Sequence, residues 1–180
     1  GYGFIWNNPA IGRAEFVNNH TLWHAECAKQ IDYIVIAGTS PADINEKFTA
    51  MIGRAPKFPE WAAGFWQCKL RYETQEELLE VAREYKRRGL PISVIVIDYF
   101  HWTMQGEWKF DPVRWPNPKA MVEELESMGI KLMVSIWPTI DPRSENYGVM
   151  RDHNYLLRGE KGVDVVFMFF GPQTYVDCTH

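Results

Sequence analysis

The sequence predicts an α/β fold in which a parallel sheet follows a smaller, strand-rich segment. Apolar or β-branched runs begin near residues 62, 92 and 131, and a helical pattern separates each run from the next. This strand-helix-strand order is typical of βαβ units and therefore of a parallel sheet. Two prolines within residues 53–59 indicate a linker, so we place a domain boundary there. A doubly wound sheet and a (β/α)8 barrel both fit, although the chain would hold under half of a barrel of about 250 residues.

The composition is that of a globular protein. Of the 180 residues, 46% are hydrophobic and 23% are charged, which excludes disorder, collagen and coiled coil. The formal net charge is -4 and no basic stripe is present, so nucleic acid is not an expected partner. The longest apolar runs, residues 92–97 and 165–170, are far shorter than the roughly 20 residues that span a bilayer, so we expect no membrane partner.

The cysteines and histidines show no metal signature. Cys27, Cys68 and Cys178 are widely spaced and odd in number, which fits neither a disulfide framework nor a metal site. We expect free, buried thiols and a reducing compartment, which favours the cytoplasm over the periplasm. His20 and His24 lie four residues apart, but their segment has strand and turn character and offers no third ligand.

Residues 1–52 are predicted to be strands and turns that end in one helix. The segments 1–6 and 31–36 have strand patterns, and asparagine-rich turns lie between them. Ser40 followed by proline is typical of a helix start, and apolar residues then recur at helical spacing until Gly53.

The later segment is predicted to alternate between strand and helix. Its expected helices begin after the caps Thr74 and Asn117 and end at Gly89 and Gly129. The expected strands are residues 62–70, 92–97, 131–137 and 163–170, with a short one at 175–176 and an irregular helix at 144–157.

Candidate functional residues follow the predicted parallel strands, where ligands bind in sheets of this kind. Asp98 comes directly after the apolar strand 92–97, and a carboxylate there requires hydrogen-bond partners, either from the fold or from a ligand. Tyr99, Phe100, His101 and Trp102 follow it. Aromatic faces and a carboxylate acceptor suit the apolar C–H faces and the hydroxyls of a sugar ring, so we favour ligand contact for Asp98.

The other carboxylates near these strand ends are predicted to be structural. Asp141 precedes a proline and is expected to cap its loop, and Glu107 and Asp111 lie in a loop that Trp108 and Phe110 would pack down. Glycoside hydrolysis requires two carboxylates about 5 to 10 Å apart. The spacing identifies only Asp98, so catalysis does not follow from these residues.

Four stretches resemble glycoside hydrolase family 31, specifically its bacterial α-xylosidase branch. They are residues 59–68, 94–102, 108–112 and 135–144. The resemblance implies that residues 1–52 are the end of an N-terminal β-sandwich with its connecting helix. Residues 53–59 would be a linker, and residues 60–180 would be the first part of a catalytic (β/α)8 barrel, also called a TIM barrel.

The resemblance also implies an activity and a substrate. We expect a retaining, exo-acting α-glycosidase that removes terminal α-linked xylose from oligosaccharides such as xyloglucan fragments, with no metal and no cofactor. Asp98 would bind sugar hydroxyls in the -1 subsite. The pocket would be shaped by Trp66, Tyr99, Phe100, Trp102 and Trp137. Trp137 stands where other branches commonly carry Asp or Asn, which narrows the site. Phe100 stands where the α-glucosidase branch carries Met, and a bulky residue that crowds the space for C6 would favour a pentose over a hexose.

The resemblance implies that both catalytic aspartates lie beyond His180. Asp177 matches the aspartate of the family's Asp-x-Thr-Asn-Pro segment, which is not the nucleophile, and His180 stands where the Asn is expected. The chain begins without Met and ends without a helix cap or closing strand, so we expect an excised piece that is inactive alone. Two alternatives stay open: an α-glucosidase or α-glucosyl transferase of the same family, and a non-catalytic carbohydrate-binding module. Homo-oligomerisation of the full-length protein also stays open.

Overall fold

The structure is a computed structural model that describes residues 1–159 and 161–177. The chain divides into two units, residues 1–57 and 58–180. The division between Lys57 and Phe58 falls inside the segment 53–59 that the sequence indicates as a linker.

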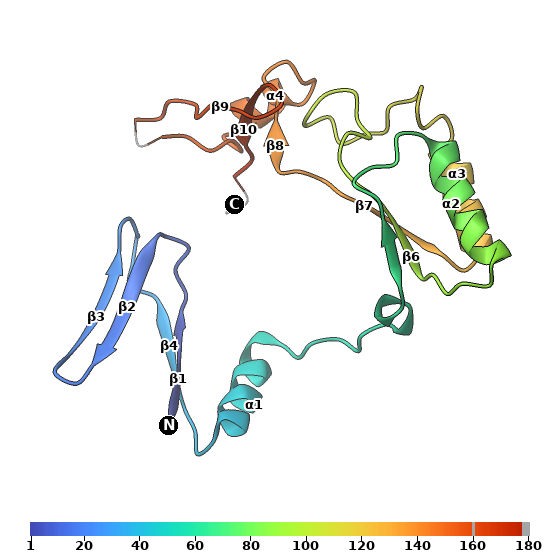
Figure 1. Ribbon diagram of the computed structural model, residues 1–180. Helices are drawn as coiled ribbons and strands as arrows, with labels where there is room; N and C mark the ends of the chain where they lie inside the picture. The colour runs from blue at the N-terminus through green and yellow to red at the C-terminus, as the bar shows by residue number, and fades with distance from the viewer. Residues whose placement is uncertain (160, 178–180) are drawn as a thin grey trace. The chain divides into compact units, whose positions relative to one another are not determined.

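The first unit contains two antiparallel strand pairs. Strand β1 (Tyr2–Trp6) pairs with β4 (Tyr33–Ala37), and β2 (Gly12–Val17) pairs with β3 (His20–Ala25), as Figure 1 shows. Aromatic rings pack the pairs together, since the Phe4 ring lies 5.0 Å from Trp23 and 5.1 Å from Phe16. Helix α1 (Pro41–Ile52) follows, and Ser40 caps it by accepting a hydrogen bond from the Asp43 amide, as predicted.

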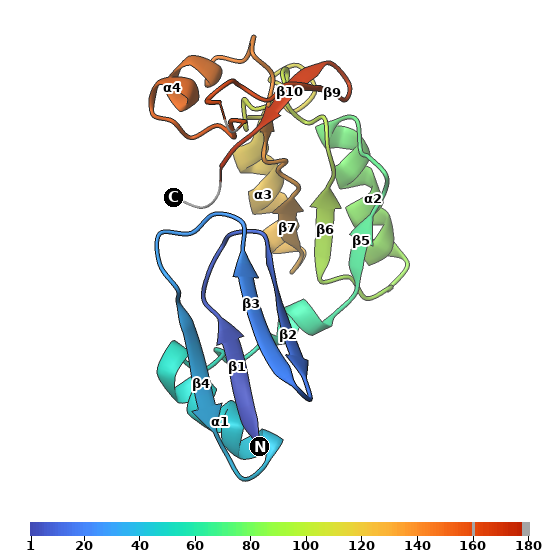
Figure 2. The ribbon, with the colours of Figure 1, turned by 90° about the vertical axis from the view of Figure 1, so that its left-hand side faces the viewer.

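The second unit is built on a parallel sheet. Its strands β5 (Trp66–Cys68), β6 (Val94–Ile97) and β7 (Lys131–Val134) are parallel and lie in the order β5-β6-β7. Helices α2 (Gln75–Arg87) and α3 (Pro118–Ser127) connect them and cover one face of the sheet (Figures 1 and 2). The predicted βαβ units are therefore confirmed.

The caps of these two helices were predictable from sequence. Thr74 Oγ1 accepts a hydrogen bond from the Glu77 amide at 3.2 Å, and the Glu77 carboxylate accepts one from the Glu73 amide at 2.7 Å. Asn117 Oδ1 accepts a hydrogen bond from the Ala120 amide at 3.0 Å. The bonds accepted by Thr74 and Asn117 satisfy amides that a helix N-terminus leaves without intrahelical partners, and the bond from Glu73 fixes the residue before the cap.

The core determines which way each strand residue faces. Ile95 and Ile97 are fully buried among residues of α2 and α3, including Leu78, Met121 and Leu125. Side chains alternate along a strand, so Val96 and the residue after β6, Asp98, face away from the helices. In a (β/α)8 barrel this face is the interior.

The predicted strand 62–70 is largely wrong. Residues Glu60–Ala63 form a 3-10 helix, η1, and the strand spans only Trp66–Cys68. The sequence Ala62-Ala63-Gly64 has no β-branched side chain to favour a strand. The turn is also held by the Trp66 indole, which donates to the Ala62 carbonyl at 3.0 Å.

The end of the chain also departs from the prediction. Helix α4 covers only Tyr147–Asp152 of the predicted 144–157, because the chain turns at Asn154, where φ is 60°. The apolar run 163–170 contributes only β9 (Phe167–Met168), since Phe170 and Gly171 have positive φ and begin a turn. Strand β10 (Pro172–Tyr175) pairs antiparallel with β9 and with β8 (Thr139–Ile140), forming a separate small sheet rather than extending the parallel one.

The cysteines differ from the expectation as well. Cys27 and Cys68 are free thiols, but both are exposed rather than buried. Cys68 faces the open side of the parallel sheet, and Cys27 lies in the loop after β3. Cys178 lies outside the described residues.

Candidate functional site

Asp98 stands at the carboxyl end of β6 on the face away from the helices. The side chain is half-buried, and its Oδ1 accepts a hydrogen bond from the Tyr99 amide at 2.8 Å. Within the described residues the structure shows no hydrogen bond to Oδ2. One carboxylate oxygen is therefore fixed by the backbone, and the other is available to a ligand.

Two neighbours of Asp98 have shifted pKa values. The Cys68 thiol has a raised pKa, first because of its partial burial and second because of the Asp98 charge, so both groups face the same space. The buried His101 ring has its Nδ1 at 3.3 Å from the Asp98 carbonyl oxygen. Burial lowers the pKa of His101, which favours the neutral ring at neutral pH.

Aromatic rings surround this strand end. Trp137 lies 5.3 Å from Tyr99, 6.2 Å from Phe100 and 6.1 Å from Trp102, measured between ring centroids. Phe100 meets Tyr99 edge-on at 4.5 Å and Trp102 edge-on at 6.0 Å. The structure thus places these four predicted site residues in one cluster with Asp98. The indole of Trp108 fixes the Trp137 backbone, because its Nε1 donates to the Trp137 carbonyl at 3.1 Å.

Phe100 has a backbone conformation that is costly for a bulky side chain. Its φ is 62°, in the left-handed region. Such a conformation costs on the order of 1 to 3 kcal/mol and persists where the surroundings impose it, commonly at ligand sites. The turn directs the ring into the cluster, and the Arg71 guanidinium lies over that ring at 5.6 Å from its centroid.

Trp66 is not part of this cluster. It begins β5 and pairs with Val94, the first residue of β6, so it lies four positions before the level of Asp98. Its ring stacks on Trp61 at 6.3 Å. The place of Trp66 in the sugar pocket therefore stays a prediction from the resemblance.

Phe169 and Phe170 belong to the cluster and were missed from sequence. Phe169 stacks on Trp137 at 5.8 Å, and Phe170 lies 5.2 Å from Phe100 and 6.4 Å from Tyr99. Both were interpreted as the end of an apolar strand. The turn at Phe170 and Gly171 instead brings Phe169 to Trp137, 32 positions earlier, and Phe170 to Phe100, 70 positions earlier.

A hollow of about 430 Å³ adjoins the cluster. Its lining includes Phe100, Phe170, Arg71, Asp141 and Arg143. The volume is within the range of small-molecule sites, roughly 300 to 1,000 Å³. Asp98 does not line this hollow, so the hollow is next to the Asp98 site and shares Phe100 with it.

Asp141 holds one wall of this hollow, in agreement with its predicted role as a loop cap. It is buried, and its carboxylate accepts from the Arg143 amide at 2.8 Å, from Nε at 2.9 Å and from Nη2 at 2.7 Å. These hydrogen bonds lower the pKa of Asp141 below its ordinary value. The predicted structural role of Asp111 also fits, since its Oδ1 accepts from the Val113 amide.

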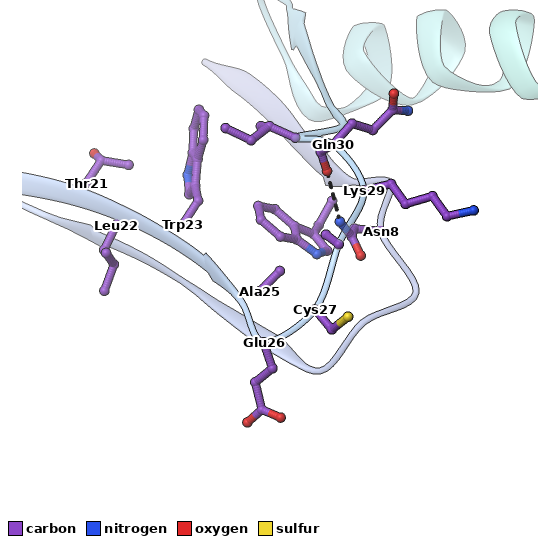
Figure 3. A pocket seen from close by; sticks show the side chains of 12 residues that line it. Asn8, Thr21, Leu22, Trp23, Ala25, Glu26, Cys27, Lys29 and Gln30 are labelled. Atoms are coloured by element: carbon purple, nitrogen blue, oxygen red, sulfur yellow. Dashed lines mark hydrogen bonds between the residues drawn. The ribbon is translucent and has the colours of Figure 1, made fainter. Parts of the chain in front are cut away.

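A larger hollow, of about 890 Å³, lies in the first unit (Figure 3). Trp23 and the segment from Ala25 to Ile31 line it, and Asn8 donates to the Gln30 carbonyl across it at 3.4 Å. Among the residues that the structure describes, Glu26 and Lys29 are the charged ones that line it. It lacks the pair of carboxylates that sugar hydrolysis requires, so we do not assign the reaction to it.

Neither a metal cluster nor a membrane helix is found in the described residues. Across 1–159 and 161–177, no group of three or more His, Cys, Asp or Glu side chains could hold a metal ion. No helix of the same residues is long and apolar enough to cross a membrane.

The family model for the glycosyl hydrolases family 31 TIM-barrel domain matches residues 55–180. The chain belongs to glycosyl hydrolase family 31. This confirms the predicted fold class, a partial TIM barrel preceded by the end of a β-sandwich, because solved structures of this family align with the whole chain. The strand ends that carry Asp98 and the aromatic cluster lie within the matched region.

The family 31 relatives include α-xylosidases. The chain is 53% identical over 180 residues to an uncharacterized family 31 glucosidase of Pseudescherichia vulneris and 39% identical over 161 residues to an α-xylosidase of Saccharolobus solfataricus. It covers 34% and 22% of those proteins, and they cover 100% and 88% of this chain. The crystal structure of a soil-metagenome family 31 α-xylosidase complexed with xylose matches the whole chain with a TM-score of 0.89 and 58% identity. This chain covers 27% of that structure. The chain therefore spans about a third or less of the length of these relatives.

Proposed function

We propose that this chain is part of a retaining, exo-acting α-glycosidase that hydrolyses terminal α-linked xylose. The observation that carries the proposal is Asp98, a half-buried carboxylate with one oxygen available to a ligand, on the barrel-interior face beside a cluster of aromatic rings. The likeness to proteins named α-xylosidases supports the choice of sugar.

The described residues supply binding in this proposal. Asp98 Oδ2 accepts hydrogen bonds from hydroxyls of the xylose in the -1 subsite, and Tyr99, Phe100 and Trp137 pack against the C–H faces of the ring. Because Oδ1 is already bonded to the Tyr99 amide, the carboxylate is held in place before the sugar arrives. We expect no metal or cofactor to take part.

The chemical steps require two further carboxylates. In double displacement, one carboxylate attacks the anomeric carbon and displaces the leaving oxygen, which the other carboxyl group protonates. Water then hydrolyses the glycosyl-enzyme, and the second group accepts the water's proton. We assign both carboxylates to sequence beyond His180, and therefore expect the 180-residue chain alone to be inactive.

An α-glucosidase or α-glucosyl transferase is the second candidate. It is favoured by a 53% identical relative whose printed name is a family 31 glucosidase. The ring of Trp137 argues for xylose, because it contacts five other rings of the cluster and leaves less room for the C6 group of a hexose.

The test uses a full-length protein that contains this chain. We expect kcat/KM for an aryl α-xyloside to exceed that for the matching α-glucoside by about tenfold or more. Substrates that differ by one carbon group are commonly discriminated to this extent. Nuclear magnetic resonance should show α-xylose as the first-formed product. A preference for the glucoside would establish the second candidate, and a β-xylose first product would contradict the retaining mechanism.

A further inference from the structure

Phe170 is an aromatic residue that the fold leaves exposed at the edge of the site. In this chain, which spans about a third or less of its relatives, the residue is 66% exposed, although its ring meets Phe100 edge-on at 5.2 Å and lies nearly parallel to Tyr99 at 6.4 Å. Part of the ring therefore packs on the cluster, and the rest is open to a ligand. An exposed ring attached to an ordered aromatic cluster offers apolar surface at little further ordering cost.

Phe170 has a strained backbone conformation, and its turn does not require a large side chain at this position. Phe170 has a φ of 53° and Gly171 a φ of 121°. Asparagine or glycine would adopt the first of these conformations with less strain, yet the position carries a large apolar side chain. Hydrogen bonds within its own hairpin hold the turn. The Gln173 side chain donates from Nε2 to the Phe169 carbonyl, and the Phe169 backbone amide donates to the Gly171 carbonyl at 2.9 Å. Strain at such a residue points to a function for its side chain.

The hollow beside Phe170 offers donors for hydroxyl groups. Arg143 is 66% exposed at its rim and uses two guanidinium N–H groups on Asp141. In the described part of the chain this leaves its other three N–H groups for a ligand. Asp141 offsets the charge of Arg143, and Glu73 and Asp111 pair with Arg71 and Arg114, the other two arginines of the lining. The hollow therefore suits a neutral ligand with hydroxyls better than an anion. Phe100 borders both this hollow and the Asp98 site, so a molecule bound at Asp98 can continue into the hollow.

We infer that Phe170 is a substrate-binding residue of the subsite next to the xylose, where its exposed ring stacks on the sugar that carries the xylose. This inference rests on the proposed function. Phe170 thereby determines how well the enzyme uses an oligosaccharide, while Asp98 binds the xylose itself. Arg143 donates to hydroxyls of the same leaving sugar.

The experiment compares two substrates on the full-length enzyme. One is an α-xylosyl-glucose disaccharide, and the other is α-xylosyl fluoride, whose leaving group has no ring to stack. Phe170→Asn removes the ring and relieves the left-handed strain, so the variant should fold without loss of thermal stability. We expect it to lower kcat/KM for the disaccharide about tenfold, chiefly through KM, and to change kcat/KM for the fluoride less than twofold. Phe170→Tyr should restore the disaccharide reaction.

Met168→Asn is the matched control, because Met168 is 76% exposed on the same hairpin. Met168→Asn should leave kcat/KM for both substrates unchanged. Equal losses on both substrates in Phe170→Asn, or no loss on the disaccharide, would overturn the inference while leaving the proposed function intact. If the unmodified enzyme cleaved neither α-xyloside, the proposed function would fail and this inference with it.

Discussion

At the scale of single residues, the site depends on side chains whose backbones are held in costly conformations. Phe100 and Phe170 have φ values of 62° and 53°, and Trp108, which bonds the Trp137 carbonyl, has a φ of 46°. For each of these bulky residues, the left-handed backbone conformation costs on the order of 1 to 3 kcal/mol of folding free energy. The surrounding ring contacts and hydrogen bonds offset this cost.

Trp137 is predicted to control the choice between pentose and hexose. In the full-length enzyme, Trp137→Asn would remove the ring that packs on Tyr99 and Phe100 and would make room for a C6 group. We expect the ratio of kcat/KM for aryl α-xyloside to that for α-glucoside to fall about tenfold. Ile136→Asn is the control, since Ile136 is 62% exposed and should leave the ratio unchanged. An unchanged ratio in Trp137→Asn would remove Trp137 from the specificity pocket.

Asp141 is predicted to stabilise the site in a pH-dependent way. Its pKa in the folded state is lowered by Arg143, so its contribution is present above the ordinary pKa of about 4 and is lost as pH falls through the lowered value. Asp141→Asn should lower the free energy of unfolding at pH 7 by about 2 kcal/mol and by less below pH 4. Thermal unfolding of the full-length enzyme and of the variant, at pH 7 and at pH 3, measures this difference in stability.

The control for that measurement is Asp152→Asn. Asp152 also pairs with an arginine, Arg151, but its side chain is 65% exposed. An exposed ion pair contributes little to stability, so we expect Asp152→Asn to change the free energy of unfolding by no more than about 0.5 kcal/mol at either pH. An Asp141→Asn effect that stayed equal at pH 7 and pH 3 would contradict the role of the carboxylate charge.

At the scale of elements, the local sequence predicted where helices begin and end better than it predicted how far strands extend. Helix caps such as Thr74 and Asn117 depend on a few neighbouring residues, and the structure confirms both. Strand extents depend on pairing partners that lie far away in sequence. This is why β5 is shorter than predicted and why the apolar run 163–170 turns back instead of extending a strand.

The packing of the loop after β6 is predicted to require glycine at position 106, because Gly106 lies directly against β8. Its φ is 91°, and an added Cβ would lie 2.8 Å from the Ile140 Cα. Gly106→Ala should therefore lower the free energy of unfolding of the full-length enzyme by about 3 kcal/mol, from overpacking and backbone strain together. Gly89→Ala is the control, because its φ is 65° but an added Cβ would meet nothing within 4 Å. We expect about 1 kcal/mol there, and equal losses at the two positions would contradict the close packing of this loop.

At the scale of the whole molecule, the parallel arc and the position of Asp98 could be predicted because they follow from periodicity. The fully apolar strand, the capped helices and the carboxylate at the strand end together indicated a parallel sheet with its ligand side. These patterns fitted a doubly wound sheet equally well, and the resemblance to family 31 favoured the barrel. The contribution of Phe169 and Phe170 could not be predicted in this way. It depends on the small β8-β10-β9 sheet, which returns the chain to Trp137, and no local pattern indicates that return.

We propose that Asp98, on the interior face of the barrel, binds the hydroxyls of the sugar. The most direct test of this claim is kcat/KM for an aryl α-xyloside, measured on the full-length enzyme and on Asp98→Ala. Removing a charged hydrogen-bond acceptor should cost about 2 kcal/mol of transition-state binding or more, equivalent to a fall of roughly 30-fold or greater. The same kcat/KM in both proteins, with the variant folded, would contradict the claim.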